Sequence, residues 1–143
     1  MLKGLSPVLG PDLLFALRSM GHGDELAIVD GNYPADTDGK NLVRADGLGL
    51  IPVLEAVLSV MPLDVGSQSP VMRTCNYESP DVPDEIHQEI DKRIQAHYPD
   101  LTVPTDNGAQ IYDRVKRCHT IVATSEHALY ANIVLRKGVV SQL

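Results

Sequence analysis

Apolar residues recur at two spacings along this chain, and the spacing separates helices from strands. Apolar positions three or four residues apart predict helices at residues 11–20, at 48–60, around Ile86, Ile90 and Ile94, and at 107–118. Short apolar runs between turn residues predict strands at residues 25–29, 42–45, 71–76, 101–103, 120–124 and 133–135. This alternation of strands and helices is typical of an α/β domain with a mostly parallel or mixed central sheet and helices on its faces.

Turn-forming and capping residues mark the boundaries of these elements. Gly21 follows the first helix, and residues 31–40 are rich in Gly, Asn, Pro and Asp, which predicts a loop. Asp46 is suitably placed to cap the second helix. Charged residues separate the isoleucines of the third helix, so we expect it to lie at the surface, and Pro99 follows its end.

Length and composition favour one globular domain that spans residues 1–143. The chain has a mass of 15.5 kDa and 43% hydrophobic residues, enough to form a core. Lys and Arg total 12 against 19 Asp and Glu, a net charge of −7, which argues against binding to nucleic acid or to an anionic membrane. Cys75 and Cys118 form no CxxC pair, and no apolar run approaches the length of a membrane span. We therefore expect a cytoplasmic protein.

Polar side chains follow two of the predicted strands. Asp30 comes directly after strand 25–29, and residues 125–132, SEHALYAN, follow strand 120–124. In α/β folds, ligands collect at the carboxyl ends of strands, so we expect these two segments to share a rim. Tyr130 and Asn132 are suited to orient a polyol because each can both donate and accept hydrogen bonds. An edge tyrosine at a strand start, and a turn opened by Asp-Gly, are the structural alternatives.

His22 lies between two glycines in the stretch MGHGDELAIVD. A histidine in such a turn is either a solvated polar residue or a group that exchanges protons near neutral pH, and the local sequence leaves both interpretations open. The glycines favour the second, because they allow a ligand to approach closely. Together, His22 and Asp30 are a candidate catalytic pair.

Recognised catalytic and phosphate-binding motifs are absent from the sequence. There is no P-loop, no GxGxxG and no GxSxG. His87, His97 and His119 match no metal-binding spacing such as HExxH, so we expect neither a metal site nor a cofactor. What remains is proton-transfer chemistry on a small molecule, or binding without catalysis.

Three stretches resemble the RbsD/FucU family of sugar mutarotases: MLKGLSPVLGPDLLFALRSMGHGDELAIVDGNYP, RADG and YANIVLRKGV. RADG and the start MLKGLSP are more similar to the L-fucose mutarotase branch. The resemblance implies an RbsD-like α/β sandwich, a ring-like homo-oligomer that is commonly a decamer, and an active site at a subunit interface. It also implies a cofactor-independent isomerase that interconverts the anomers of a monosaccharide.

The resemblance assigns roles to individual residues. His22 matches the family's proton-donating histidine, and Asp30 matches its substrate-binding aspartate. Tyr130, Ala131 and Asn132 match the Y-[AG]-N triplet that binds substrate, and Tyr130 is in addition a candidate to relay a proton.

Two positions depart from the family pattern. Gly108 occupies the place of a basic residue that contacts the sugar, and Asp36 that of a second histidine found in many fucose members. The alternatives are therefore a D-ribose pyranase that interconverts pyranose and furanose forms, and a non-catalytic, transport-associated sugar-binding protein.

Overall fold

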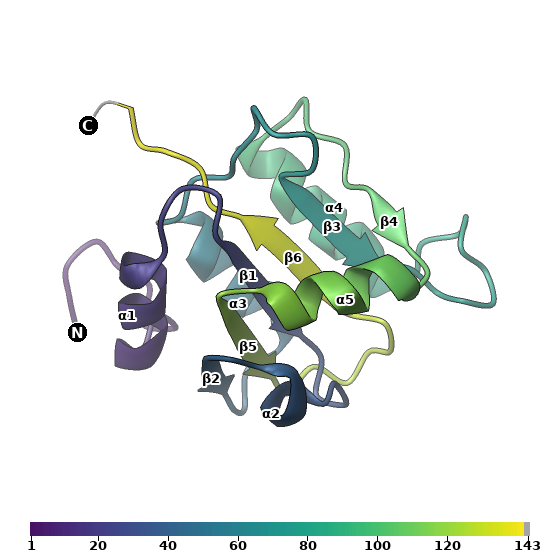
Figure 1. The fold of residues 1–143 in the computed structure, drawn as a ribbon, viewed down its shortest axis with the longest axis horizontal. Helices are drawn as coiled ribbons and strands as arrows, with labels where there is room; N and C mark the ends of the chain where they lie inside the picture. Colours follow the sequence, from purple (N-terminus) through teal and green to yellow (C-terminus); the bar gives the residue numbers. More distant parts are fainter. Residues whose placement is uncertain (142–143) are drawn as a thin grey trace.

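A six-stranded sheet with the strand order β2-β5-β1-β6-β3-β4 forms the centre of the computed structural model, which describes residues 1–141 (Figure 1). The strands are β1 (Glu25–Val29), β2 (Leu42–Ala45), β3 (Val71–Thr74), β4 (Thr105–Asp106), β5 (Thr120–Thr124) and β6 (Ile133–Arg136). β5 pairs in parallel with β2 and β1, and β4 pairs in parallel with β3. β6 runs antiparallel to both of its neighbours, so the sheet is mixed.

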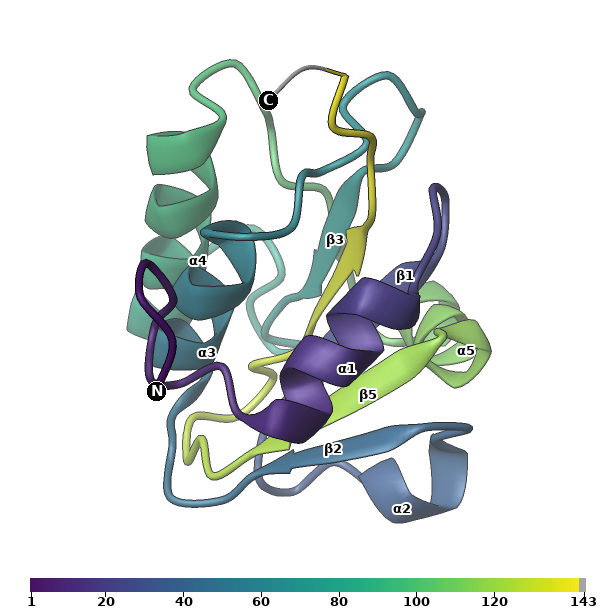
Figure 2. The ribbon, with the colours of Figure 1, turned by 90° about the vertical axis from the view of Figure 1, so that its left-hand side faces the viewer.

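Helices cover both faces of the sheet, as Figure 2 shows. They are α1 (Pro11–Ser19), α2 (Ala35–Asp38), α3 (Leu50–Leu58), α4 (Glu85–His97) and α5 (Ala109–Arg117). The larger core cluster joins α1, α3 and α4 to one face, and the smaller cluster joins α2 and α5 to the other. The predicted α/β sandwich with a mixed sheet is therefore confirmed. Residues 142 and 143, which the prediction of one domain included, lie outside the described residues.

The central strand β1 contributes to both clusters. Leu26 and Ile28 point into the larger cluster, and Ala27 and Val29 into the smaller one, because successive side chains of a strand face opposite sides. A strand that is buried on both faces has apolar residues at every position. The apolar run ends where the chain leaves the sheet. Asp30, the first polar residue after β1, is therefore placed at the carboxyl edge of the sheet.

The sequence predicted most elements correctly. The exceptions are very short elements and contacts between residues that are far apart in the chain. β1, β2 and β5 have the predicted bounds, and α1, α3 and α5 are shorter than predicted by one to four residues. The strand predicted at 101–103 is wrong, because pairing with β3 begins only at Thr105, which lies opposite Arg73. The loop 31–40 contains the one-turn helix α2, whose four residues are too few for a periodic pattern.

The predicted cap of the second helix is also wrong. The N-cap of α3 is Gly49, and the Leu50 N–H donates to the Glu126 carboxylate at 3.1 Å. Asp46 instead forms an exposed ion pair with Arg44 at 2.8 Å. The helix start is thus satisfied by a residue from the far end of the chain, which local sequence does not reveal.

α4 is less superficial than its charge pattern indicates. Ile90, Ile94 and His87 are fully buried, and the helix packs against α3. Charged residues occupy its opposite side, as expected for an amphipathic helix on the outside of a sandwich. Within residues 1–141, no helix combines the length and apolar character needed to span a membrane.

Candidate functional site

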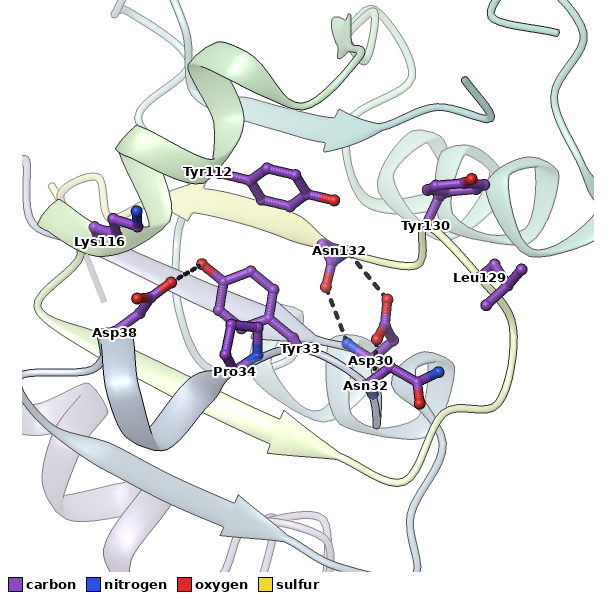
Figure 3. Close-up of a pocket in the computed structure, with 10 residues that line it drawn as sticks. All are labelled: Asp30, Asn32, Tyr33, Pro34, Asp38, Tyr112, Lys116, Leu129, Tyr130 and Asn132. Atoms are coloured by element: carbon purple, nitrogen blue, oxygen red, sulfur yellow. Dashed lines mark hydrogen bonds between the residues drawn. The ribbon is translucent and has the colours of Figure 1, made fainter. Parts of the chain in front are cut away.

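A cavity of about 390 Å³ opens at the carboxyl end of β1 (Figure 3). Its walls come from the loop after β1, from α2 and α5, and from the segment that precedes β6. It is lined by Asp30, Asn32, Tyr33, Pro34, Asp38, Tyr112, Lys116, Leu129, Tyr130 and Asn132. The volume lies in the range of about 300–1,000 Å³ that is usual for small-molecule sites. The structure therefore brings Asp30, Tyr130 and Asn132 together on one rim, as the sequence predicts.

Asp30 and Asn132 form the buried floor of this cavity. The Asn132 amide nitrogen donates to the Asp30 carboxylate at 3.1 Å, and its amide oxygen accepts the Asp30 backbone N–H at 3.1 Å. A further bond, 2.9 Å long, runs from the Asn32 N–H to the same carboxylate. Asp30 and Asn132 are 6% and 2% exposed, so these bonds hold both side chains in a single geometry.

Burial raises the pKa of Asp30 above its usual value of 3.8, although hydrogen bonds from Asn32, Asn132, Ala131 and Tyr33 partly oppose the rise. Desolvation disfavours the charged form, whereas donated hydrogen bonds favour it. A carboxylate in this situation is a strong hydrogen-bond acceptor for a ligand hydroxyl, because few water molecules compete for it.

Tyr130 contributes a half-buried ring to the cavity from an unusual backbone conformation. Its φ is +56°, the one positive φ of a non-glycine residue among residues 1–141. Its ring lies against that of Tyr77, with the ring centres 4.7 Å apart. Ala131, the middle member of the triplet, is fully buried and presents no side chain to the cavity.

Tyr33, Tyr112 and Lys116 also line the cavity, and the sequence analysis did not identify them as a set. The Tyr33 hydroxyl donates to Asp38 at 2.9 Å, and the Tyr33 and Tyr112 rings are 5.9 Å apart. Burial, together with a hydrogen bond to Tyr77, raises the pKa of Tyr112, so its hydroxyl stays protonated. Tyr112 and Lys116 are four residues apart on one helix, so the sequence could have placed them on a common face.

Gly108, which the resemblance aligns with a basic residue, is the N-cap of α5 with φ +113°. A Cβ atom at this position would overlap the Tyr77 hydroxyl and lie 2.9 Å from the Tyr112 ring. Two tyrosines thus occupy the space beside Gly108. Lys116, one helical turn beyond Tyr112, is the basic residue that lines the cavity.

His22 lies away from this cavity within a single chain. It precedes the amino end of β1, whereas Asp30 follows the carboxyl end, and the five-residue strand alone separates its two ends by about 13 Å. The expectation that both face one pocket is therefore not met within one chain. Sequence proximity was misleading, because an extended strand carries neighbouring residues to opposite edges of a sheet.

His22 has polar partners of its own. Its Nε2 lies 3.2 Å from an Asp64 carboxylate oxygen, and Arg136 Nε donates to the same oxygen at 3.2 Å. Arg136 also lies 3.6 Å from Glu25. Its guanidinium would be 3.2 Å from a Cβ atom on Gly23, whose φ is +85°. Gly23 therefore leaves space for the Arg136 side chain, whereas the sequence predicted that it would leave space for a ligand beside His22.

Potential metal ligands do not gather in the described part of the chain. Across residues 1–141, no three His, Cys, Asp or Glu side chains are arranged to hold an ion. The chemistry available at the cavity is hydrogen bonding by Asp30, Asn132 and the tyrosine hydroxyls, with Lys116 at the edge.

Comparison with known proteins finds a matching family model and several similar proteins. Residues 3–140 match the family model described as the RbsD / FucU transport protein family. The fucose mutarotase of Mus musculus is 39% identical over 96% of this chain and 94% of its own length. That of Homo sapiens is 37% identical over 98% and 95%. The crystal structure of the Streptococcus pneumoniae fucose mutarotase in complex with L-fucose superposes with a TM-score of 0.90, 38% identity, and coverage of 97% and 99%.

Proposed function

The chain belongs to the RbsD/FucU transport protein family, and we propose that it is a sugar mutarotase that interconverts the anomers of a fucose-like monosaccharide. The activity is supported by similarity over almost the full length to two fucose mutarotases, which are 39% and 37% identical to this chain. The observation that carries the proposal is that Asp30, Tyr130 and Asn132 line one cavity. These are the residues that the family resemblance assigned to sugar binding.

The reaction needs one base and one acid but no redox chemistry. A base removes the proton from the anomeric hydroxyl, the bond between C1 and the ring oxygen breaks, and an acid protonates the ring oxygen. The open-chain aldehyde then rotates about its C1–C2 bond, and the reverse steps close the ring on the other face. General acid–base catalysis of this kind contributes on the order of 10²–10⁴ in rate.

Asp30 and Asn132 hold sugar hydroxyls in this proposal. The Asp30 carboxylate retains free lone pairs, and the Asn132 amide retains one N–H because Asp30 occupies only the other. The Tyr130 hydroxyl contacts the sugar and is suited to pass a proton. The rings of Tyr33 and Tyr112 offer an apolar wall for the C–H groups of the sugar.

In this proposal His22 exchanges the proton with the sugar oxygen, and the His22 that acts at each cavity comes from a neighbouring subunit. Its place at the opposite edge of the sheet from Asp30 supports this part of the proposal. Closed rings arise from head-to-tail interfaces, in which one edge of a subunit meets a different edge of the next. In this proposal, a ring-like oligomer, which we expect to be a decamer, brings His22 of one chain to the cavity of another.

Saturation-difference NMR of anomeric exchange tests the function. With L-fucose, exchange between the two pyranose anomers is expected to be faster with protein than without it. D-ribose is the comparison, since faster pyranose–furanose exchange there and none with L-fucose would favour a pyranase. If calorimetry detects sugar binding but neither sugar exchanges faster with protein, the protein binds sugar without catalysing the exchange.

A further inference from the structure

We propose that His87 is a positioning residue for Tyr130, and that it holds the Tyr130 backbone from within the core. The inference rests on the proposed function, because it concerns the ring that Tyr130 presents to the sugar. His87 has no place in the mechanism above and lies on α4, away from the cavity lining. It is nevertheless 0% exposed, and a buried polar side chain requires specific partners.

The Tyr130 backbone needs such support. Its left-handed conformation brings Cβ close to the backbone and is disfavoured for a residue with a bulky side chain. Strained residues persist where surrounding contacts determine their geometry, and they cluster at functional sites. Without those contacts, we expect the segment to relax and the ring to leave its place in the cavity wall.

Two hydrogen bonds to backbone groups define the state of the His87 imidazole. The Asp84 backbone N–H lies 3.1 Å from Nδ1, and the Tyr130 carbonyl oxygen lies 2.9 Å from Nε2. A backbone N–H only donates and a carbonyl only accepts, so Nδ1 must accept and Nε2 must carry the proton. The Asp84 carboxylate is 3.8 Å from Nδ1, too far to compete for a proton there. His87 is therefore a neutral imidazole protonated at Nε2.

Thr74 on β3 also forms hydrogen bonds with residues 130–132. Its hydroxyl donates to the Tyr130 carbonyl and accepts the Asn132 N–H at 3.1 Å. The Tyr130 carbonyl thus accepts one hydrogen bond from His87 on α4 and another from Thr74 on β3. Ala131 between these two anchors is fully buried, so the segment has little freedom to relax.

Paired substitutions separate this role from a purely structural one. The amide of glutamine reaches the position of Nε2, so His87→Gln keeps a donor for the Tyr130 carbonyl. The shorter asparagine places its oxygen near the position of Nδ1, so His87→Asn keeps only the contact with Asp84. We expect His87→Asn to lower kcat by on the order of 10- to 100-fold, since small misplacements of reacting groups have effects of this size. His87→Gln should retain most of the wild-type kcat.

The matched control is His97→Gln, at an exposed histidine of the same helix whose Nε2 lies 3.0 Å from a Glu55 carboxylate oxygen. It should leave kcat unchanged. If kcat instead follows the melting temperature across all three variants, His87 serves stability alone and the inference is wrong. The wild type reports on the proposed function separately, because an inactive wild type contradicts that function and not the geometry.

A measurement on the wild type keeps the inference testable if both His87 variants fail to fold. Nitrogen-15 NMR at pH 7 should show the His87 side chain as the neutral tautomer with its proton on Nε2. An imidazolium, or a proton on Nδ1, would overturn the assignment, because neither allows the two backbone bonds.

Discussion

Asn132 contacts Asp30 through both polar atoms of its amide, although the two residues are 102 positions apart in the chain. One bond reaches the carboxylate and the other the backbone N–H of the same residue, each 3.1 Å long. An amide with both atoms engaged has one orientation, so the lone pairs and the N–H left for a ligand point in defined directions. Sugars differ in the directions of their hydroxyl groups, so a site whose donors and acceptors point in fixed directions can distinguish one sugar from another.

Replacing Asp30 should change how stability depends on pH. Because burial raises the pKa of Asp30, the folded chain binds more protons than the unfolded chain above pH 3.8. The stabilising contribution of Asp30 is therefore full below pH 3.8 and declines as pH rises through the higher folded-state pKa. Urea unfolding between pH 3.5 and 7 should show Asp30→Asn gaining on the wild type as pH rises.

Asp36→Asn is the control for this measurement, because Asp36 is exposed on α2. Its difference in unfolding free energy from the wild type should stay flat over the same range. An Asp30→Asn difference that is equally flat, or that runs the other way, would show that hydrogen bonds outweigh burial at Asp30.

Asp64 should matter for catalysis through His22. Its carboxylate accepts from His22 Nε2 and from Arg136, so it fixes the ring and leaves Nδ1 free for the sugar. We expect His22→Ala to reduce kcat by roughly 10²–10⁴-fold and Asp64→Asn by about tenfold. Asp100→Asn, an exposed carboxylate outside the site, should be neutral. Full activity of Asp64→Asn with an inactive His22→Ala would leave His22 without a positioning partner.

Mixing two inactive variants tests whether the site is shared. His22→Ala lacks the proton-exchanging group, and Asn132→Ala lacks a cavity residue. If each site takes these residues from different subunits, co-refolding equal amounts should restore up to about a quarter of wild-type activity, because half of the subunits carry each intact residue. Activity that stays at the level of the separate variants, in an oligomer shown by light scattering to be mixed, would place both residues in one chain's site.

Gly108→Ala should destabilise the fold more than Gly47→Ala. Both glycines have a positive φ, but a Cβ at Gly47 meets nothing within 4 Å, whereas one at Gly108 overlaps Tyr77. The shared backbone cost is of order 1–3 kcal/mol, and the difference between the variants isolates the clash. Chemical unfolding of both should show it, together with a raised KM for Gly108→Ala. Equal losses would mean that Tyr77 moves aside freely.

Amino-acid order alone determined the parts of this protein that depend on neighbours in the chain. The apolar run at 25–29 and the helical spacing at 11–20 are local patterns, and burial of one face or both follows directly from them. The polar residues after β1 and before β6 were likewise identifiable, because strand ends in an α/β sheet meet at a common edge. Asp30 and Asn132 were found in this way.

Tertiary structure decided what depends on contacts between distant segments. Only the packing of distant segments brings Glu126 to the start of α3 and buries His87 against the Tyr130 carbonyl. Each of these contacts is a hydrogen bond between residues that are far apart in the chain. The type of a side chain does not indicate which distant residue it will contact. The physical reason is that long-range partners are chosen by the whole set of buried surfaces, whereas periodicity records only which side of an element is buried.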